Sequence, residues 1–185
     1  TLICSADYHH IDKEVLAPEF SNYSEKYWDS RVLSPSCLLF YVGVDKKLDK
    51  LKHHNLFFDE NIDAHVEDIY DTKIWPKKPL FYACCPSKTD ASVAPENKEN
   101  LFILVPITPG LEDNETIRRK YFRMIMSRLE AYCGHEIEKY IEYNRSYCIK
   151  DFIEDYNSYK GNAYGLANTL SQTANLKPKI INKQI

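Results

Sequence analysis

Two pairs of adjacent histidines, His9–His10 and His53–His54, are the side chains best suited to metal binding in this sequence. Imidazoles that share a zinc ion usually stand four residues apart on one helix face, whereas adjacent residues on a strand point to opposite faces. This spacing predicts no metal site. The cysteines form no C-x-x-C pattern, and we expect them to be small buried residues of a reducing cytoplasm; they are Cys4, Cys37, Cys84, Cys85, Cys133 and Cys148.

The sequence contains no local motif for nucleophilic catalysis or for nucleotide binding. Serines, cysteines and histidines are present, but no G-x-S-x-G nucleophile elbow positions them, so we assign no catalytic residue. Only five glycines occur in 185 residues, and no two of them form a G-x-G pair. The chain therefore contains neither a dinucleotide-binding fingerprint nor a P-loop.

Aromatic side chains are the stronger signal, because the chain has 14 tyrosines and 8 phenylalanines. Several of them fall on apolar runs that predict strands. They either fill the core or line an apolar cavity for a long lipid or polyene, and the spacing leaves both roles open. These strand positions are Tyr41, Phe57, Phe58, Phe81, Tyr82 and Phe102.

The elements that must position these side chains come in separate runs of strands and helices. Apolar runs predict a buried strand over residues 1–5 and five further strands over 36–44, 53–58, 80–85, 101–107 and 140–148. Helical spacing predicts helices over 8–16, 21–31, 62–70, 115–133 and 150–156. This order favours an α+β fold, with a mixed or antiparallel sheet of about five strands and helices packed on it.

Composition is typical of one globular domain. The formal net charge is −3, the pI is about 6.1 and the mean hydropathy is −0.48, which argues against a general nucleic-acid binder. No apolar run approaches the roughly 18 residues that a membrane span needs. Residues 14–28 suit either an interfacial membrane element or a lid packed on the domain, through Leu16, Phe20, Tyr23, Tyr27 and Trp28.

Several segments, in order along the chain, resemble the bacterial phytoene desaturases, which are FAD-dependent carotenoid desaturases of the amine-oxidase-like group. ICSADYHH resembles the segment that leads from the flavin domain into the substrate domain, and KYWDSRVLSPSCLLFYVGVDKKL resembles the one that enters the substrate-domain sheet. HHNLFFD and PLFYACCPSKTDASVAPENKENLFILVPI resemble the central strands with the loop between them. DFIEDYNSYKGNAYGLANTLSQTA resembles the segment just before the chain returns to the flavin.

The resemblance implies that residues 1–185 are mainly the substrate domain of a longer protein. Residues 1–7 and 176–185 would then be crossing strands or linkers to an FAD-binding domain whose motif this chain lacks. The full-length protein would use FAD to dehydrogenate phytoene toward lycopene, and the isolated fragment would be inactive. Its partner would be a long apolar polyene, with no nucleic acid involved.

The resemblance also implies two groups of candidate site residues. The first group would line the polyene cavity on the sheet and consists of Tyr41, Phe57, Tyr82 and Phe102. The second group would lie near the flavin domain and consists of Ala6, Asp7, Tyr164 and Gly165. No metal ligand and no catalytic base is assigned.

A polyene substrate lives in membranes, so we expect a cytoplasmic protein with peripheral contact at the inner face of the cell membrane. The fragment is also expected to self-associate through an apolar face. One alternative function is a related flavoprotein carotenoid oxidoreductase, namely a 3,4-desaturase, an isomerase or a saturase. Another, of a different class, is a non-enzymatic lipid- or partner-binding α+β module.

Overall fold

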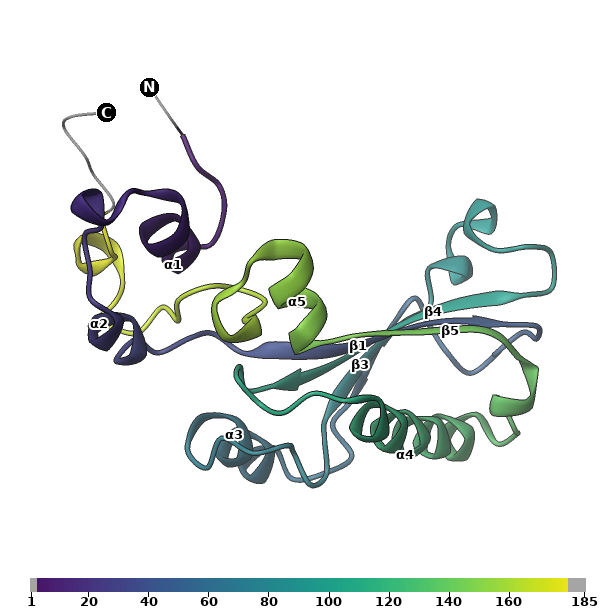
Figure 1. Ribbon diagram of the computed structural model, residues 1–185. Helices are drawn as coiled ribbons and strands as arrows, with labels where there is room; N and C mark the ends of the chain where they lie inside the picture. Colours follow the sequence, from purple (N-terminus) through teal and green to yellow (C-terminus); the bar gives the residue numbers. More distant parts are fainter. Residues whose placement is uncertain (1–2, 180–185) are drawn as a thin grey trace.

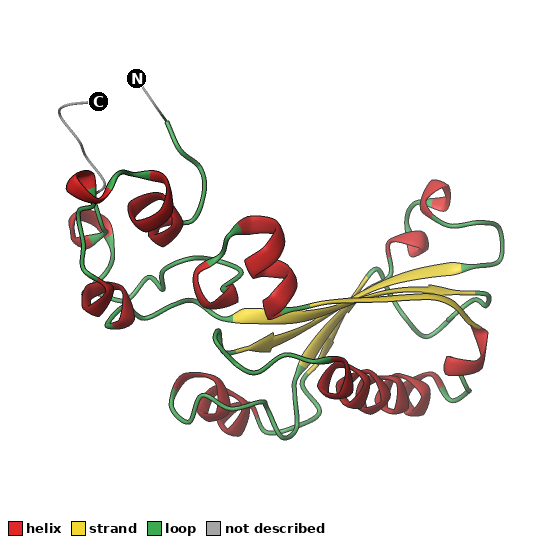
Figure 2. Cartoon of the chain, viewed as in Figure 1, coloured by secondary structure: helices red, strands yellow, loops and turns green. Residues whose placement is uncertain are grey.

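A computed structural model describes residues 3–179 and confirms an α+β fold built on one antiparallel sheet (Figures 1 and 2). The strand order is β2-β3-β4-β1-β5, and every neighbouring pair is antiparallel. The five strands of the described residues are β1 (Ser36–Val44), β2 (His54–Phe57), β3 (Phe81–Cys84), β4 (Glu99–Ile107) and β5 (Ile141–Tyr147).

Within the described residues, two helices precede β1, one connects β2 to β3, one connects β4 to β5, and one follows β5. They are α1 (Tyr8–His10), which runs on into a π-helical turn (Ile11–Val15), then α2 (Glu25–Asp29), α3 (Ile62–Tyr70), α4 (Glu115–Cys133) and α5 (Ile149–Tyr156). The longest, α4, begins where the Asn114 side chain accepts from the backbone N–H of Ile117 and ends at Gly134. Gly134 takes a φ of 78°, which a glycine adopts without strain. Short 3-10 turns cover Pro18–Phe20, Pro86–Lys88, Ala91–Val93, Glu138–Tyr140, Tyr159–Gly161 and Ala174–Leu176.

The hydrophobic core lies between the sheet and α4, which covers one of its faces (Figure 1). Strand side chains alternate between two faces, and in β4 every second residue from Glu99 to Ile107 is buried. In β1 the inward side chains Leu38, Phe40 and Val42 are buried, and the Phe40 ring meets the α4 ring of Phe122 edge-on at 5.2 Å. The alternate side chains point to the other face.

Helix α5 lies on that other face and is tied to α4 by a buried ion pair network. The Arg118 guanidinium donates to Asp113 through Nε at 2.7 Å and to Asp151 through an NH2 group at 2.6 Å. Asp151 also accepts from the backbone N–H of Cys148 at 2.8 Å, which closes the first turn of α5. The hydrogen bond with Asp113 and the attraction of both carboxylates raise the pKa of Arg118, so this charge is permanent.

Two sequence expectations about the N-terminal segment are corrected. The predicted strand over residues 1–5 is wrong for Ile3–Ser5, which form no strand; Thr1 and Leu2 lie outside the described residues. Ile3 is 90% exposed, and an apolar run becomes a strand only beside a partner strand. The helix expected over 21–31 is limited to Glu25–Asp29, because the Ser24 side chain caps its start.

Candidate functional site

The two ends of the described chain meet in a junction beside the sheet. Leu33 and Leu166 form an isolated antiparallel bridge, and the backbone N–H of Ser34 donates to the carbonyl of Gly165 at 2.9 Å. The Gln172 side chain makes two hydrogen bonds to the backbone of Val32. Its Oε1 accepts from the Val32 N–H and its Nε2 donates to the Val32 carbonyl, both at 2.8 Å. Residues 32–34 and 165–172 are therefore fixed against each other.

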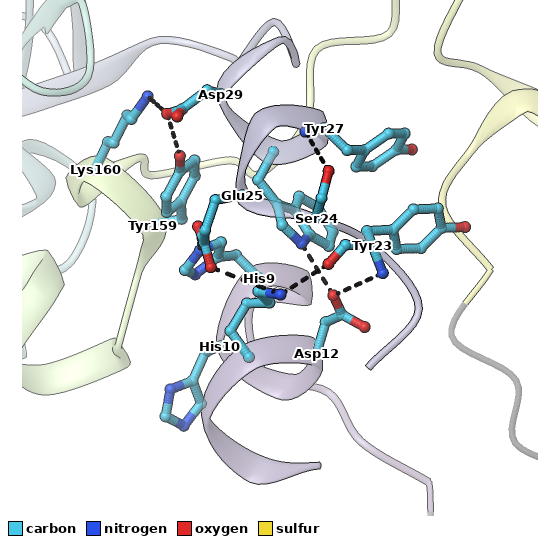
Figure 3. Close-up of polar contacts among 12 residues, drawn as sticks. His9, His10, Asp12, Tyr23, Ser24, Glu25, Tyr27, Asp29, Tyr159 and Lys160 are labelled. Carbon is cyan, nitrogen blue, oxygen red and sulfur yellow. Dashed lines mark hydrogen bonds and ion pairs between the residues drawn. The ribbon is translucent and has the colours of Figure 1, made fainter. Parts of the chain in front are cut away.

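A buried carboxylate organises the N-terminal side of this junction (Figure 3). Asp12 is 0% exposed and accepts from the backbone N–H of Asn22 at 2.6 Å, from that of Tyr23 at 3.3 Å and from the indole Nε1 of Trp28 at 3.0 Å. Burial acts to raise the pKa of Asp12, but these hydrogen bonds outweigh it, so the pKa lies below its usual value. Asp12 is thus an anion that holds α2 against α1.

Further contacts join α1 to α2, and both of these helices to the turn after α5 (Figure 3). His9 bonds Glu25 through Nε2 at 3.2 Å, and its ring stacks on Tyr159 at 4.0 Å. The Tyr159 hydroxyl and the Lys160 ammonium both donate to the same Asp29 oxygen at 2.8 Å. We call His9, Asp12, Glu25, Asp29 and Tyr159 the junction cluster.

A pocket of about 400 Å³ opens beside the junction cluster. Three of the four residues expected near the flavin domain, Ala6, Asp7 and Gly165, line it. Asp7 caps α1 through one carboxylate oxygen, and its other oxygen accepts from Asn162 at 3.1 Å. Tyr164 is not among the lining residues and is 67% exposed. We call this space the junction pocket.

Three of the four expected polyene contacts lie together on the sheet face that α4 leaves uncovered. The Tyr41 ring is 5.5 Å from Phe102, which is 6.4 Å from Tyr82. Phe57 does not join them: it is buried on the α4 face, where it stacks on Phe81 at 4.3 Å. Side chains of successive strand residues point to opposite faces of the sheet. Leu56, which pairs with Tyr82, therefore points to the face that α4 leaves uncovered, and Phe57, which pairs with Phe81, points to the α4 face. We call the face that carries Tyr41, Tyr82 and Phe102 the open sheet face.

Helix α5 connects the junction pocket to the open sheet face. Phe152 and Tyr156 line the pocket, and the Phe152 ring meets Tyr147 edge-on at 4.9 Å. Tyr147 pairs with Leu39 of β1 in the sheet. No site role was predicted for these α5 rings, although their i, i+4 spacing places both on one side of the predicted helix.

Residues 14–28 match the lid among the two roles left open for them, and one histidine pair differs from its sequence expectation. Trp28 is 1% exposed, so it packs inside the junction rather than facing a membrane. The rings of His53 and His54 are 4.2 Å apart. They do not diverge, because His53 precedes β2 and is outside the regular strand geometry. Over residues 3–179, every helix is too short or too polar to cross a bilayer.

The cysteines mostly fill the core as expected. Four of them are buried and Cys84 is half-buried, while Cys4 is exposed. Burial raises the pKa of Cys37 to about 12 and that of Cys85 to about 11, so both remain thiols at neutral pH. The buried four are Cys37, Cys85, Cys133 and Cys148.

Comparison with known proteins gives the chain a family context, although no family model matches it. A carotenoid 3,4-desaturase of Haloarcula japonica is 41% identical over 177 residues, which cover 96% of this chain and 36% of that protein. A zeta-carotene-forming phytoene desaturase of Myxococcus xanthus is 28% identical, over 96% of this chain and 34% of that protein. A 4,4'-diapophytoene desaturase (4,4'-diaponeurosporene-forming) of Staphylococcus haemolyticus is 27% identical, over 98% of this chain and 38% of that protein.

The chain spans about a third of the length of these curated relatives. The similarity extends along nearly all of it, as the resemblance of its segments predicted. The chain is a homologue of the carotenoid desaturases over almost its entire length.

Proposed function

We propose that this chain is the polyene-binding region of a carotenoid desaturase, an oxidoreductase that is FAD-dependent in its full-length form. The observation that carries the proposal is the open sheet face, where Tyr41, Tyr82 and Phe102 stand together. Helix α5 continues this aromatic surface toward the junction pocket. The homology to carotenoid desaturases supports the same function.

The chemistry of the open sheet face suits a long hydrocarbon. Tyr41 is 39% exposed and Leu56, on the neighbouring edge strand, is 66% exposed, so apolar surface is available to a ligand. A polyene has no charge or hydrogen-bonding group, and its binding free energy comes from apolar burial. The charged side chain of this face, Arg145, stands opposite Tyr41 on the other edge strand, β5. A polyene along β1, β4 and β3 would therefore meet mainly rings and aliphatic groups.

The residues described here do not fit a complete FAD. No G-x-G pair occurs in the chain, so no tight glycine turn can cradle a pyrophosphate. The junction pocket is lined by aromatic and small side chains together with the carboxylate of Asp7, which repels a phosphate. The flavin would accordingly be held by another part of a longer protein, and the role of this chain is to bind and orient the polyene.

Two substrates are candidates for that longer protein. The resemblance of the segments favours phytoene, dehydrogenated toward lycopene. The 41% identity to a carotenoid 3,4-desaturase favours an already desaturated carotene as the alternative substrate. Both substrates need the same elongated apolar surface, so polyene binding is the property to test first.

Polyene binding can be measured by transfer from liposomes. Liposomes loaded with lycopene are incubated with the chain, and carotenoid that co-elutes with the protein is quantified by absorbance. Replacing Tyr41 and Phe102 by serine is expected to reduce the transferred lycopene by about tenfold, since two ring contacts are lost. The matched control is Tyr70→Ser, an exposed tyrosine on α3 away from this face. Equal transfer by both variants would contradict the proposal.

A chimaera tests the reaction. This chain replaces the aligned third of the Haloarcula japonica carotenoid 3,4-desaturase, and the chimaera is produced in host strains that accumulate either phytoene or lycopene. Chromatography of the pigments is expected to show a desaturated product in one of the strains. An isomerised or saturated product would favour the related flavoprotein reactions, and polyene binding without any reaction would favour a non-enzymatic lipid-binding module.

A further inference from the structure

The strongest unassigned cluster lies at the β2 edge of the sheet. His54 is the first residue of β2 and pairs directly with Cys84, the last residue of β3. His53 precedes β2, and its carbonyl accepts from the backbone N–H of Cys85 at 2.8 Å. One ligand atom from each of His53, His54 and Cys84 lies within 4.8 Å of the other two. Two imidazoles and a thiol thus converge from two strands.

Hydrogen bonds hold both imidazole rings by the same nitrogen. His53 Nδ1 lies 2.5 Å from the Thr89 hydroxyl, and His54 Nδ1 lies 2.6 Å from the Tyr82 hydroxyl. Such outer-shell contacts fix the tautomer and orientation of metal-binding histidines. With Nδ1 engaged in each ring, Nε2 is the atom that each ring can offer to a cation.

The spacing is close to what a tetrahedral cation requires. Zinc–nitrogen bonds of about 2.0 Å and zinc–sulfur bonds of about 2.3 Å place neighbouring ligand atoms about 3.3–3.8 Å apart. The ligand atoms lie within 4.8 Å of one another, so side-chain movements of about 1–1.5 Å at most, chiefly by the exposed His54, bring them into this range. His54 is exposed, so a cation can enter the site from solvent along this side chain.

We propose that His53, His54 and Cys84 form a binding site for a divalent cation of borderline softness, such as Zn²⁺ or Co²⁺. On binding, the Cys84 S–H bond breaks, the proton passes to solvent, and the thiolate sulfur bonds the cation. Three protein ligands leave a fourth position for water or another group. The cation also ties His53 and His54 at the start of β2 to Cys84 at the end of β3, so it stiffens an edge of the open sheet face.

Co²⁺ is the probe, because a thiolate bound to Co²⁺ gives a charge-transfer band in the near ultraviolet. Titrating the reduced chain with Co²⁺ is expected to produce this band with one equivalent bound, and Zn²⁺ is expected to remove it by displacement. Cys84→Ser should abolish the band, and His54→Gln should weaken Co²⁺ binding at least tenfold. The outer-shell variant Thr89→Ala should weaken it by about tenfold or more.

Matched controls separate this site from other thiols and imidazoles. Cys4→Ser removes the exposed cysteine and His10→Gln alters the other histidine pair, and both are expected to leave the band and the affinity unchanged. Circular dichroism of each variant shows that it is folded. The proposal is overturned if Co²⁺ gives no thiolate band with the wild-type chain, or if the band survives Cys84→Ser. Neither result bears on polyene binding, which the liposome transfer measures separately.

Discussion

The junction cluster and the open sheet face use their side chains in opposite ways. In the junction cluster, Asp12 and Asp29 each accept several hydrogen bonds, and the rings of His9 and Tyr159 are stacked. On the open sheet face, Tyr41 and its neighbours are half-exposed and contact one another mainly through ring edges. A region whose polar groups are all engaged keeps one shape, whereas an exposed apolar surface is available to a ligand.

This difference predicts that substitutions in the junction cluster change folding stability, whereas substitutions on the open sheet face change ligand binding. Substitutions in the junction cluster leave buried polar groups without partners, which is costly in a folded protein. Substitutions on the open sheet face remove surface that water already reaches in part, so they cost little stability. The largest losses of stability are therefore expected at the junction and the smallest on the open sheet face.

Asp12→Ala should be the most destabilising change. It leaves the Trp28 indole N–H and the backbone N–H of Asn22 and Tyr23 without their acceptor in a buried place. The expected loss is about 3 kcal/mol or more in the free energy of unfolding, measured by urea denaturation. The exposed Asp49 provides the control, and Asp49→Ala should change it by less than about 0.5 kcal/mol. Equal losses would show that Asp12 does not organise the junction.

Gly161→Ala should destabilise the turn after α5 by about 2–3 kcal/mol. Gly161 has a φ of +63°, and an added Cβ would lie 2.6 Å from both the side chain and the carbonyl oxygen of Ile149. Gly165 is the matched comparison: its φ is +76°, but a Cβ there meets nothing within 4 Å. Gly165→Ala should therefore cost only about 1 kcal/mol, the backbone strain alone. Thermal denaturation of both variants measures the difference, and similar losses would contradict the steric argument.

Acid should weaken the junction cluster through Asp12. Its pKa is lowered in the folded chain, so its stabilising effect is complete above the unfolded value of about 3.9. That effect is lost as the pH falls through the lower folded pKa, where the folded state must also take up the proton. Urea denaturation between pH 5 and pH 2 should show a steeper fall for the wild type than for Asp12→Asn. Parallel curves would mean that Asp12 does not couple folding to pH.

Tyr41→Ser should have the smallest effect on stability, about 1 kcal/mol or less, because the side chain is already partly in water. Lycopene transfer from liposomes should nevertheless fall severalfold, since the ring is a polyene contact in the proposed function. Phe40→Ser provides the contrast on the other face of the same strand. Phe40 is 1% exposed, and its loss should unfold much of the chain. A large stability loss in Tyr41→Ser would remove the distinction between the two faces.

Apolar runs and helical spacing predicted most of the fold. The apolar runs at 36–44 and 101–107 and the helical spacing of 115–133 reflect burial in the core, and all three became elements with nearly those limits. The strand over 1–5 failed because a strand depends on a partner that local sequence does not reveal.

The candidate site was less predictable, because it depends on which residues tertiary contacts bring together. Phe57 was assigned to the polyene surface, but a difference of one position in strand parity places it in the core. The resemblance of their segments predicted Asp7 and Gly165 each near a flavin domain, and in the structure both line the junction pocket. His9 and Tyr159 stack although they are 150 residues apart, which no spacing rule predicts.

The long sequence separations across the junction set the order in which the chain can fold during synthesis. The Val32–Gln172 contacts join residues 140 positions apart, and the Asp7–Asn162 bond joins residues 155 positions apart. At about 5–20 residues per second, a ribosome needs roughly 7–30 s to make the residues between such partners. The sheet and α4 can assemble in that interval, whereas Asp7 and Val32 leave the ribosome before the sheet and find these partners last. The Val32–Gln172 contacts therefore report the completion of folding rather than its beginning.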